Sequence, residues 1–194
     1  MIFCAHRVNK IEDLKSIPTE YGIEIDIRDN LVMAHDPFET GDSFVDFVEH
    51  YNHKFLIINV KSERLEYRIK ELLNQKNIVN YFFLDSSFPM IYKLSNEGER
   101  NIAIRFSEFE SIENLKLMSG KIDWVWVDCF TKLPLDKETY QLIKSMNYKI
   151  CIVSPELQNQ QFKLLEYKNY MRVNQIVPDM ICTKIYNIEE WKEK

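Results

Sequence analysis

Two acidic residues near the start of the chain have a spacing that suggests a cation-binding site. Glu24 and Asp26 are two positions apart in the run Gly22–Arg28, which is otherwise mostly apolar, and His35 follows soon after. Alternate side chains of a β-strand point to the same face, so the two carboxylates would share one surface. Oxygen ligands at this spacing suit Mg²⁺ or Ca²⁺ better than a soft metal. A solvated strand with two exposed acids has the same pattern, so the neighbouring elements are needed to choose between these interpretations.

Short apolar runs, each followed by an amphipathic stretch, recur along the whole chain. This alternation is typical of parallel strands connected by crossover helices. About eight such runs are found, which is the number of strands in a (β/α)₈ TIM barrel. The predicted strands are Ile2–His6, Gly22–Arg28, Phe55–Lys61, Tyr81–Ser87, Ile102–Ser107, Trp124–Phe130, Lys149–Ser154 and Met180–Ile185.

The segments between these runs carry helix and turn signals. Apolar residues in 65–73 recur at the spacing of one helical face, and Asp136 precedes a further helix as its N-cap. The Asp29-Asn30 pair is a turn signal, so residues 31–34 are expected to return as a short β-hairpin extension after the second strand. With 194 residues the barrel is compact, and we expect a single domain over residues 1–194 with short loops.

Most of the predicted strands end in polar side chains. Active sites of TIM barrels form at the carboxyl ends of the strands, so these residues are the candidates for chemistry. Asn59 and Lys61 share one face of their strand, as do Asp85 and Ser87 on the next, so each pair is expected to face the barrel axis. The full set of candidates is His6, Arg7, Glu24, Asp26, His35, Asn59, Lys61, Asp85, Ser87, Arg105, Asp128 and Ser154.

Arg105 is a charged residue inside an otherwise apolar strand. Such a residue is seldom buried without an anionic partner. Two interpretations are open: Arg105 binds an anionic group of a substrate, or it pairs with Asp85 or Asp128.

The composition argues against several classes of partner. The net charge is −5 and the basic residues form no stripe, so we expect no nucleic-acid partner and no membrane partner. The start MIFCAHR lacks the pattern of a secretory signal, and no apolar window is long enough to span a membrane, which favours a cytoplasmic protein. The four cysteines are widely spaced in apolar runs, as expected of buried free thiols.

Several motifs resemble those of one family. The sequences AHR at Ala5–Arg7, GIEIDIR at Gly22–Arg28 and AHDPF at Ala34–Phe38 are similar to the signature of the glycerophosphodiester phosphodiesterases. This family belongs to the phosphatidylinositol phospholipase C-like superfamily, which also includes sphingomyelinase D. The runs INVK at Ile58–Lys61 and FFLDSSFP at Phe82–Pro89 stand where the family has its third and fourth strands. The resemblance is sharpest over roughly the first 90 residues and only architectural afterwards.

The resemblance implies a metal-dependent enzyme that cleaves a small phosphodiester of the glycerophosphodiester kind. His6 and His35 would be the acid–base pair, and Glu24 and Asp26 would hold a divalent cation, Mg²⁺ or Ca²⁺. The cation and basic groups would neutralise the phosphate oxygens as charge shifts in the transition state. Either histidine could be the base, and the product could be a cyclic phosphate or a hydrolysed ester. The residues expected to contact the substrate are Arg7, Lys61, Arg105 and Ser87.

The chain departs from the family at the third strand. The family has Glu-x-Lys there, whereas this chain has Asn59 and Lys61, so a neutral amide oxygen replaces an expected anionic ligand. An Asn oxygen can bind Mg²⁺ or Ca²⁺, and Asp85 is expected to supply a substitute acid. Two other functions therefore stay open: a barrel that binds a phosphorylated ligand without cleaving it, and a metal-dependent isomerase or lyase on the same fold. Nothing in the sequence indicates the oligomeric state.

Overall fold

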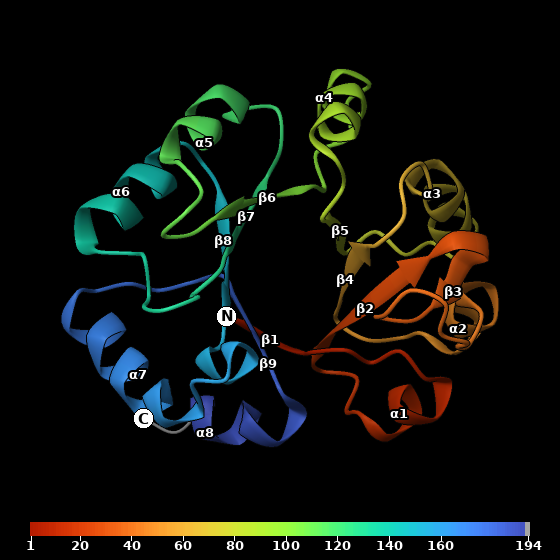
Figure 1. The fold of residues 1–194 in the computed structure, drawn as a ribbon, viewed down its shortest axis with the longest axis horizontal. Helices are drawn as coiled ribbons and strands as arrows, with labels where there is room; N and C mark the ends of the chain where they lie inside the picture. The colour runs from red at the N-terminus through yellow and green to blue at the C-terminus, as the bar shows by residue number, and fades with distance from the viewer. Residues whose placement is uncertain (193–194) are drawn as a thin grey trace.

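The fold is a ring of eight parallel strands surrounded by helices, in a computed structural model that describes residues 1–192 (Figure 1). The predicted compact TIM barrel is therefore confirmed. Each predicted run contains one of these strands, and most of the strands end one to three residues earlier than expected. The strands are β1 (Ile2–Ala5), β2 (Gly22–Arg28), β4 (Phe55–Val60), β5 (Tyr81–Leu84), β6 (Ala103–Phe106), β7 (Trp124–Val127), β8 (Lys149–Val153) and β9 (Met180–Thr183).

Within residues 1–192, eight α-helices form the outer layer of the barrel (Figure 1). They are α1 (Ile11–Ser16), α2 (Phe44–His50), α3 (Glu66–Gln75), α4 (Phe88–Asn96), α5 (Ile112–Met118), α6 (Lys137–Ser145), α7 (Leu164–Val173) and α8 (Ile188–Lys192). The helix α1 is short because Pro18 disfavours helical backbone at Ile17, which is extended. Asp136 caps α6 as predicted, since its side chain accepts a hydrogen bond from the Thr139 amide.

A short antiparallel strand, β3 (Val32–Met33), follows β2 and pairs with it. The turn between them is a 3₁₀ segment, Asp29–Leu31, in which Asn30 has a φ of +58°. Asparagine adopts this left-handed conformation more readily than most residues. The predicted hairpin extension is therefore present, and it carries the chain to His35 at the carboxyl end of the barrel.

The ring is least regular between β5 and β6. The strand order is β5-β4-β2-β1-β9-β8-β7-β6, and neighbours in this order form parallel ladders. The two end strands, in contrast, are joined by an isolated parallel bridge between Phe83 and Ile102. The Phe83 amide donates a hydrogen bond to the Asn101 carbonyl at 2.9 Å across this seam. The barrel is thus nearly closed, with its weakest backbone pairing at the seam between β5 and β6.

Side chains alternate between the helix-facing surface and the barrel interior. On β2, the three isoleucines belong to the outer core, whereas Glu24 and Asp26 lie on the opposite face and are fully buried. The lower interior is filled by aromatic side chains, and the ring centroids of Phe82 and Trp124 are 4.9 Å apart. Trp126 belongs to the same cluster. The polar residues at the carboxyl end of the barrel therefore lie next to a close-packed layer of apolar side chains in the barrel interior.

The four cysteines are buried and free, as predicted. Burial raises the pKa of each thiol, which keeps it in the unreactive protonated form. Within residues 1–192, no helix has the length and apolar character needed to cross a membrane.

Candidate functional site

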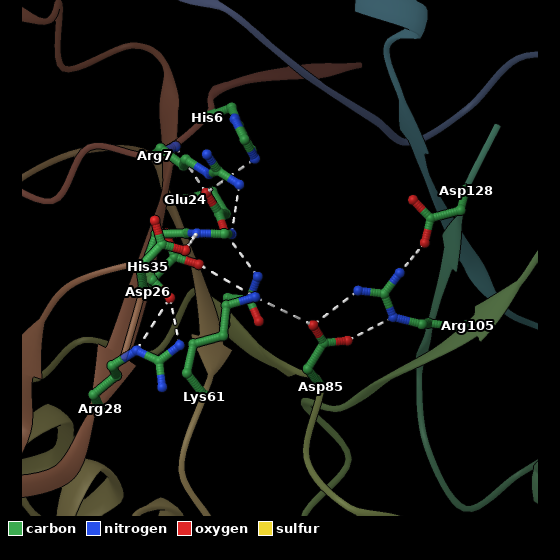
Figure 2. A network of polar contacts seen from close by, with 12 residues as sticks. His6, Arg7, Glu24, Asp26, Arg28, His35, Lys61, Asp85, Arg105 and Asp128 are labelled. Carbon is green, nitrogen blue, oxygen red and sulfur yellow. Dashed lines mark hydrogen bonds and ion pairs between the residues drawn. The ribbon is translucent and has the colours of Figure 1, made fainter. Parts of the chain in front are cut away.

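Polar side chains from several strands meet at the carboxyl end of the barrel (Figure 2). We call one group the carboxylate–imidazole cluster, consisting of His6, Glu24, Asp26, His35 and Asn59. A second group on the other side of the mouth is the arginine cluster, consisting of Asp85, Arg105 and Asp128. Figure 2 shows Lys61 between the two groups.

Glu24 is completely buried, and two groups donate hydrogen bonds to its carboxylate. The Arg7 backbone amide donates to Oε2 at 2.7 Å, and the Asn59 side-chain amide donates to Oε1 at 3.1 Å. Arg7 has a φ of +58°, and with this backbone its amide faces Glu24. Burial, followed by the nearby charge of Asp26, raises the pKa of Glu24 to about 7. The two donors therefore do not fully compensate two buried carboxylates.

Asp26 is also fully buried, and only part of its carboxylate is satisfied. The Asn9 side chain donates to Oδ2 at 2.9 Å and accepts from the Asp26 amide at 2.8 Å. The other oxygen, Oδ1, accepts no hydrogen bond from the described residues and lies 3.5 Å from the Lys61 ammonium. Asn59 Oδ1 is likewise buried without a partner in the described part of the chain. Two buried oxygens on neighbouring strands are thus unsatisfied, which is costly unless a ligand pairs with them.

These oxygens form a donor set that fits a hard divalent cation. Asp26 and Asn59 are direct neighbours in the β2–β4 register, and Glu24 is on the same face of β2. Among residues 1–192, no group of three or more His, Cys, Asp and Glu side chains is arranged to hold a metal. A cation bound by Glu24 and Asp26 would therefore take its third protein ligand from Asn59, whose amide would turn its oxygen inward.

His6 follows β1 and lies between Glu24 and Lys184, the residue directly after the last barrel strand. Its Nε2 is 3.8 Å from Glu24 Oε2, and its Nδ1 is 3.2 Å from Lys184 Nζ. Burial, followed by the positive charges of Lys184 and Arg7, lowers the pKa of His6 to about 3. His6 is therefore a neutral imidazole near pH 7, and these surroundings make it a weaker base than free imidazole.

His35 lies at the same end of the barrel, in the loop after β3. Its Nδ1 is 2.7 Å from Asp36 Oδ1, and its Nε2 is 2.5 Å from Arg7 Nη2. The His35 carbonyl accepts a hydrogen bond from Arg28 Nε at 3.1 Å, which ties this loop to β2. Arg7 thus contacts Glu24 through its amide and His35 through its guanidinium, so one residue connects the carboxylates to the second imidazole.

The arginine cluster is fully paired. Arg105 donates from Nε and Nη2 to the two oxygens of Asp85 at 2.6 and 2.8 Å, and from Nη1 to Asp128. Burial lowers the pKa of Arg105, but Asp85 and Asp128 together raise it above its usual value. The ion-pair interpretation of Arg105 is therefore observed with both acids. Whether it also binds a substrate stays a prediction.

Asp85 reaches this cluster in an unexpected way. Leu84 already faces the barrel interior, so a continuing strand would turn Asp85 outward, but Asp85 has a φ of +61° and points into the mouth. The expectation that Asp85 and Ser87 share a strand face does not hold, because β5 ends at Leu84. Since Arg105 binds both oxygens of Asp85, its carboxylate is less available to a cation than the Asn59 oxygen.

Lys61 stands between the clusters, with Nζ 3.5 Å from Asp26 Oδ1 and 3.7 Å from Asp85 Oδ2. At the position predicted from its strand parity, it places an ammonium group in the middle of the mouth. Ser87 lines a cavity of about 210 Å³ together with Lys61 and Asp85.

Two residues of the candidate site, Lys184 and Asn9, were not predicted from the sequence. Lys184 continues the interior face of β9, which Met180 and Cys182 occupy, so the alternation could have predicted it. Asn9 lies in the loop after β1, where no periodic pattern indicates that its side chain would bind Asp26. Ser154, by contrast, is occupied by structural contacts, because it accepts a hydrogen bond from Trp191 Nε1 at 2.8 Å.

Comparison with known proteins finds no family model that matches this chain and no matching curated protein. The resemblance to glycerophosphodiester phosphodiesterases therefore stays a prediction from the motifs.

Proposed function

We propose that the protein is a divalent-metal-dependent phosphodiesterase that acts on a glycerophosphodiester-like substrate. The observation that carries the proposal is the convergence of two imidazoles, two buried carboxylates and one lysine at the carboxyl end of a TIM barrel. The motif resemblance supports the same reaction class, and the fold by itself would not.

Binding of the phosphate depends on the positive groups of the mouth. Lys61, Arg7 and Lys184 are basic side chains in contact with the carboxylate–imidazole cluster. Glu24, Asp26 and Asn59 would hold the cation, which supplies Lewis-acid stabilisation of the phosphoryl oxygens when it is bound. An anionic substrate would also draw the Arg7 guanidinium from His35 and leave His35 Nε2 facing the phosphate.

Proton transfer is divided between the histidines by their surroundings. His6 is neutral near pH 7, and an anionic substrate would offset the positive charges of Lys184 and Arg7 that weaken it as a base. His6 then takes the proton of the attacking hydroxyl, from water or from the substrate itself, as its oxygen bonds to phosphorus. His35, oriented by Asp36, protonates the leaving alcohol oxygen as its bond to phosphorus breaks. An attacking substrate hydroxyl gives a cyclic phosphate, whereas water gives the monoester.

The test is a rate measurement with a panel of water-soluble glycerophosphodiesters, with and without Mg²⁺, Ca²⁺ or Mn²⁺. His6→Ala and His35→Ala should each lower the rate by roughly 10²–10⁴-fold, the usual contribution of a general acid or base. Asp128→Asn is the matched control, because it alters a buried polar group of the same mouth outside the carboxylate–imidazole cluster. Activity untouched by both histidine substitutions would refute the proposal.

A barrel that binds a phosphorylated ligand without turnover is the second candidate. It is favoured by one observation, that Asn59 directs its amide nitrogen and not its oxygen toward Glu24. If the protein is such a binding barrel, wild-type protein binds a phosphodiester without cleaving it, and Asn59→Glu restores no activity.

A further inference from the structure

The exposed phenylalanines of this protein are gathered at one end of the barrel. Of twelve phenylalanines, five have exposed side chains, from 39% for Phe130 to full exposure for Phe38, and all five follow the carboxyl end of a strand. Phe38 is fully exposed, and Phe109 and Phe162 are each 77% exposed. We call this set the aromatic rim: Phe38 after β3, Phe88 after β5, Phe109 after β6, Phe130 after β7 and Phe162 after β8.

The aromatic rim surrounds the candidate site, because all parallel strands of a barrel end on the same face. Phe38 is three residues from His35, which is itself about one-third exposed, so the reactive imidazole and a rim side chain belong to one loop. On the last loop, Tyr186 is 74% exposed and lies two residues from Lys184, which contacts His6. The loops after β3, β5, β6, β7, β8 and β9 therefore each carry an exposed aromatic ring, whereas the loops after β1 and β4 carry none.

A group of aromatic rings exposed to water on a protein surface is unfavourable unless the rings contact an apolar partner. Aromatic side chains are also the ones that settle at membrane–water interfaces. Away from the rim, exposed apolar side chains such as Leu117 and Val173 lie on the outer helices, and no exposed phenylalanine is among them. Leu165 lines a cavity there together with Met1 and Val177. The clustering of this one residue type around the site points to a function of the rim.

The shape of the rim favours a lipid surface over a protein. The rings come from several loops around a polar mouth, and Phe109 and Phe130 lie together with their ring centroids 6.1 Å apart. Fluid lipid headgroups can fill such a mouth while the rings insert between acyl chains.

The charge of the rim loops selects the kind of lipid. Acidic residues in these loops include Asp36, Glu39, Glu108 and Glu110, against few basic residues, such as Lys132 and Lys163. Such loops are repelled by an anionic surface but not by a zwitterionic one. The sequence expectation of no membrane partner rested on the missing basic stripe, and that argument applies to anionic membranes only.

We propose that the aromatic rim docks the mouth of the barrel on a zwitterionic lipid surface, where the site receives a phosphodiester lipid headgroup. The docking part stands on the rim alone. The identity of the substrate rests on the proposed phosphodiesterase function.

The test is sedimentation of the full-length protein with phosphatidylcholine vesicles. Phe109→Ala/Phe162→Ala should weaken vesicle binding by about a hundredfold, since losing the insertion of each ring is expected to cost roughly tenfold. Leu117→Ala/Val173→Ala is the matched control, with side chains of similar exposure on the outer helices, and should bind as the wild type does. Neither pair belongs to the carboxylate–imidazole cluster.

Three outcomes would overturn the docking proposal. The first is wild-type protein that does not bind phosphatidylcholine vesicles, or that binds only after phosphatidylglycerol is added. The second is equal loss of binding in both double variants. The third is a rim that mediates self-association, seen as a concentration-dependent dimer by ultracentrifugation that disappears in Phe109→Ala/Phe162→Ala.

A soluble-substrate assay separates this inference from the proposed function. Both double variants should cleave a water-soluble glycerophosphodiester at the wild-type rate, while only the rim variant loses activity on a vesicle-borne phosphodiester lipid. Vesicle binding without any phosphodiester cleavage would refute the proposed function and leave the docking surface standing. Cleavage of the soluble ester without vesicle binding would refute the docking alone.

Discussion

The two polar clusters at the mouth of the barrel both contain buried acids but differ in how those acids are paired. Burial raises the pKa of Asp128 as well as that of Glu24, so the contrast lies in the ion pairs and hydrogen bonds. In the arginine cluster, one guanidinium satisfies the two acids that flank it. In the carboxylate–imidazole cluster, Glu24 has a raised pKa, His6 has a lowered one, and buried oxygens of Asp26 and Asn59 have no hydrogen-bond partner among the described residues.

This difference separates a structural network from a binding site. A buried charge network that is complete has little to gain from a ligand, whereas one with uncompensated negative charge gains from a cation. The arginine cluster also links the loop after β5 to β6, across the seam where backbone pairing is weakest. We therefore assign stability mainly to the arginine cluster and chemistry mainly to the carboxylate–imidazole cluster.

The largest expected effect is on the arginine cluster. Arg105→Met should lower the free energy of unfolding by about 3 kcal/mol, since it removes the guanidinium that pairs with the buried Asp128 and leaves Asp85 with the more distant Lys61 alone. Urea denaturation at neutral pH measures the change. Adding Asp85→Asn and Asp128→Asn to Arg105→Met should recover part of the loss, because the unpaired charges are then gone. No recovery would mean that Arg105 stabilises the barrel through packing.

The second largest expected effect is an increase in stability, from a substitution in the carboxylate–imidazole cluster. Glu24→Gln should stabilise the cation-free protein by about 2 kcal/mol above pH 7, because the folded protein then no longer buries a charged carboxylate. The pKa of Glu24 is raised from 4.5 to about 7 on folding, so its stabilising contribution is complete below about pH 4.5 and is lost as the pH rises through 7. Asn59 can turn its unpaired oxygen toward the new amide.

Melting temperatures of wild type and Glu24→Gln, measured in a chelator from about pH 5 to pH 8, test this sign. The two curves should lie close together at the acid end and separate as the pH rises. A Glu24→Gln protein that is less stable than the wild type at pH 8 would show that the Glu24 carboxylate is satisfied without a cation.

The smallest expected effect concerns the loop that supports Asp26. Asn9→Ala removes a side chain that both donates to and accepts from Asp26, and should cost about 1 kcal/mol of stability. Asn9→Asp should cost more in a chelator, because it adds a third acid to the cluster, and a divalent cation should reverse much of that extra loss. Equal stability of Asn9→Ala and wild type would show that the Asn9 side chain does not stabilise the carboxylate–imidazole cluster.

The regular part of this arrangement could be predicted from sequence. Alternation with a period of two placed Glu24, Asp26, Asn59 and Lys61 on interior faces, and the strand ends of a barrel gather such residues at one mouth. The hairpin that returns the chain to His35 followed from the turn residues Asp29 and Asn30.

The rest depends on backbone irregularities and on distant pairs. Arg7 and Asp85 have positive φ angles, which redirect an amide toward Glu24 and a carboxylate toward Arg105, and no periodic pattern predicts such angles for these residue types. Lys184 reaches His6 from the far end of the chain. Where several partners lie within reach of one charge, as for Arg105, the sequence cannot choose among them.

The most direct test of the contrast between the clusters is calorimetric titration of chelator-treated protein with Mg²⁺, Ca²⁺ or Mn²⁺ at about pH 8. We predict one divalent cation bound per chain, with binding abolished in Glu24→Gln and Asp26→Asn and retained in Asp85→Asn. Cation binding that survives Glu24→Gln, or that disappears in Asp85→Asn, would contradict the assignment of the cation to the carboxylate–imidazole cluster.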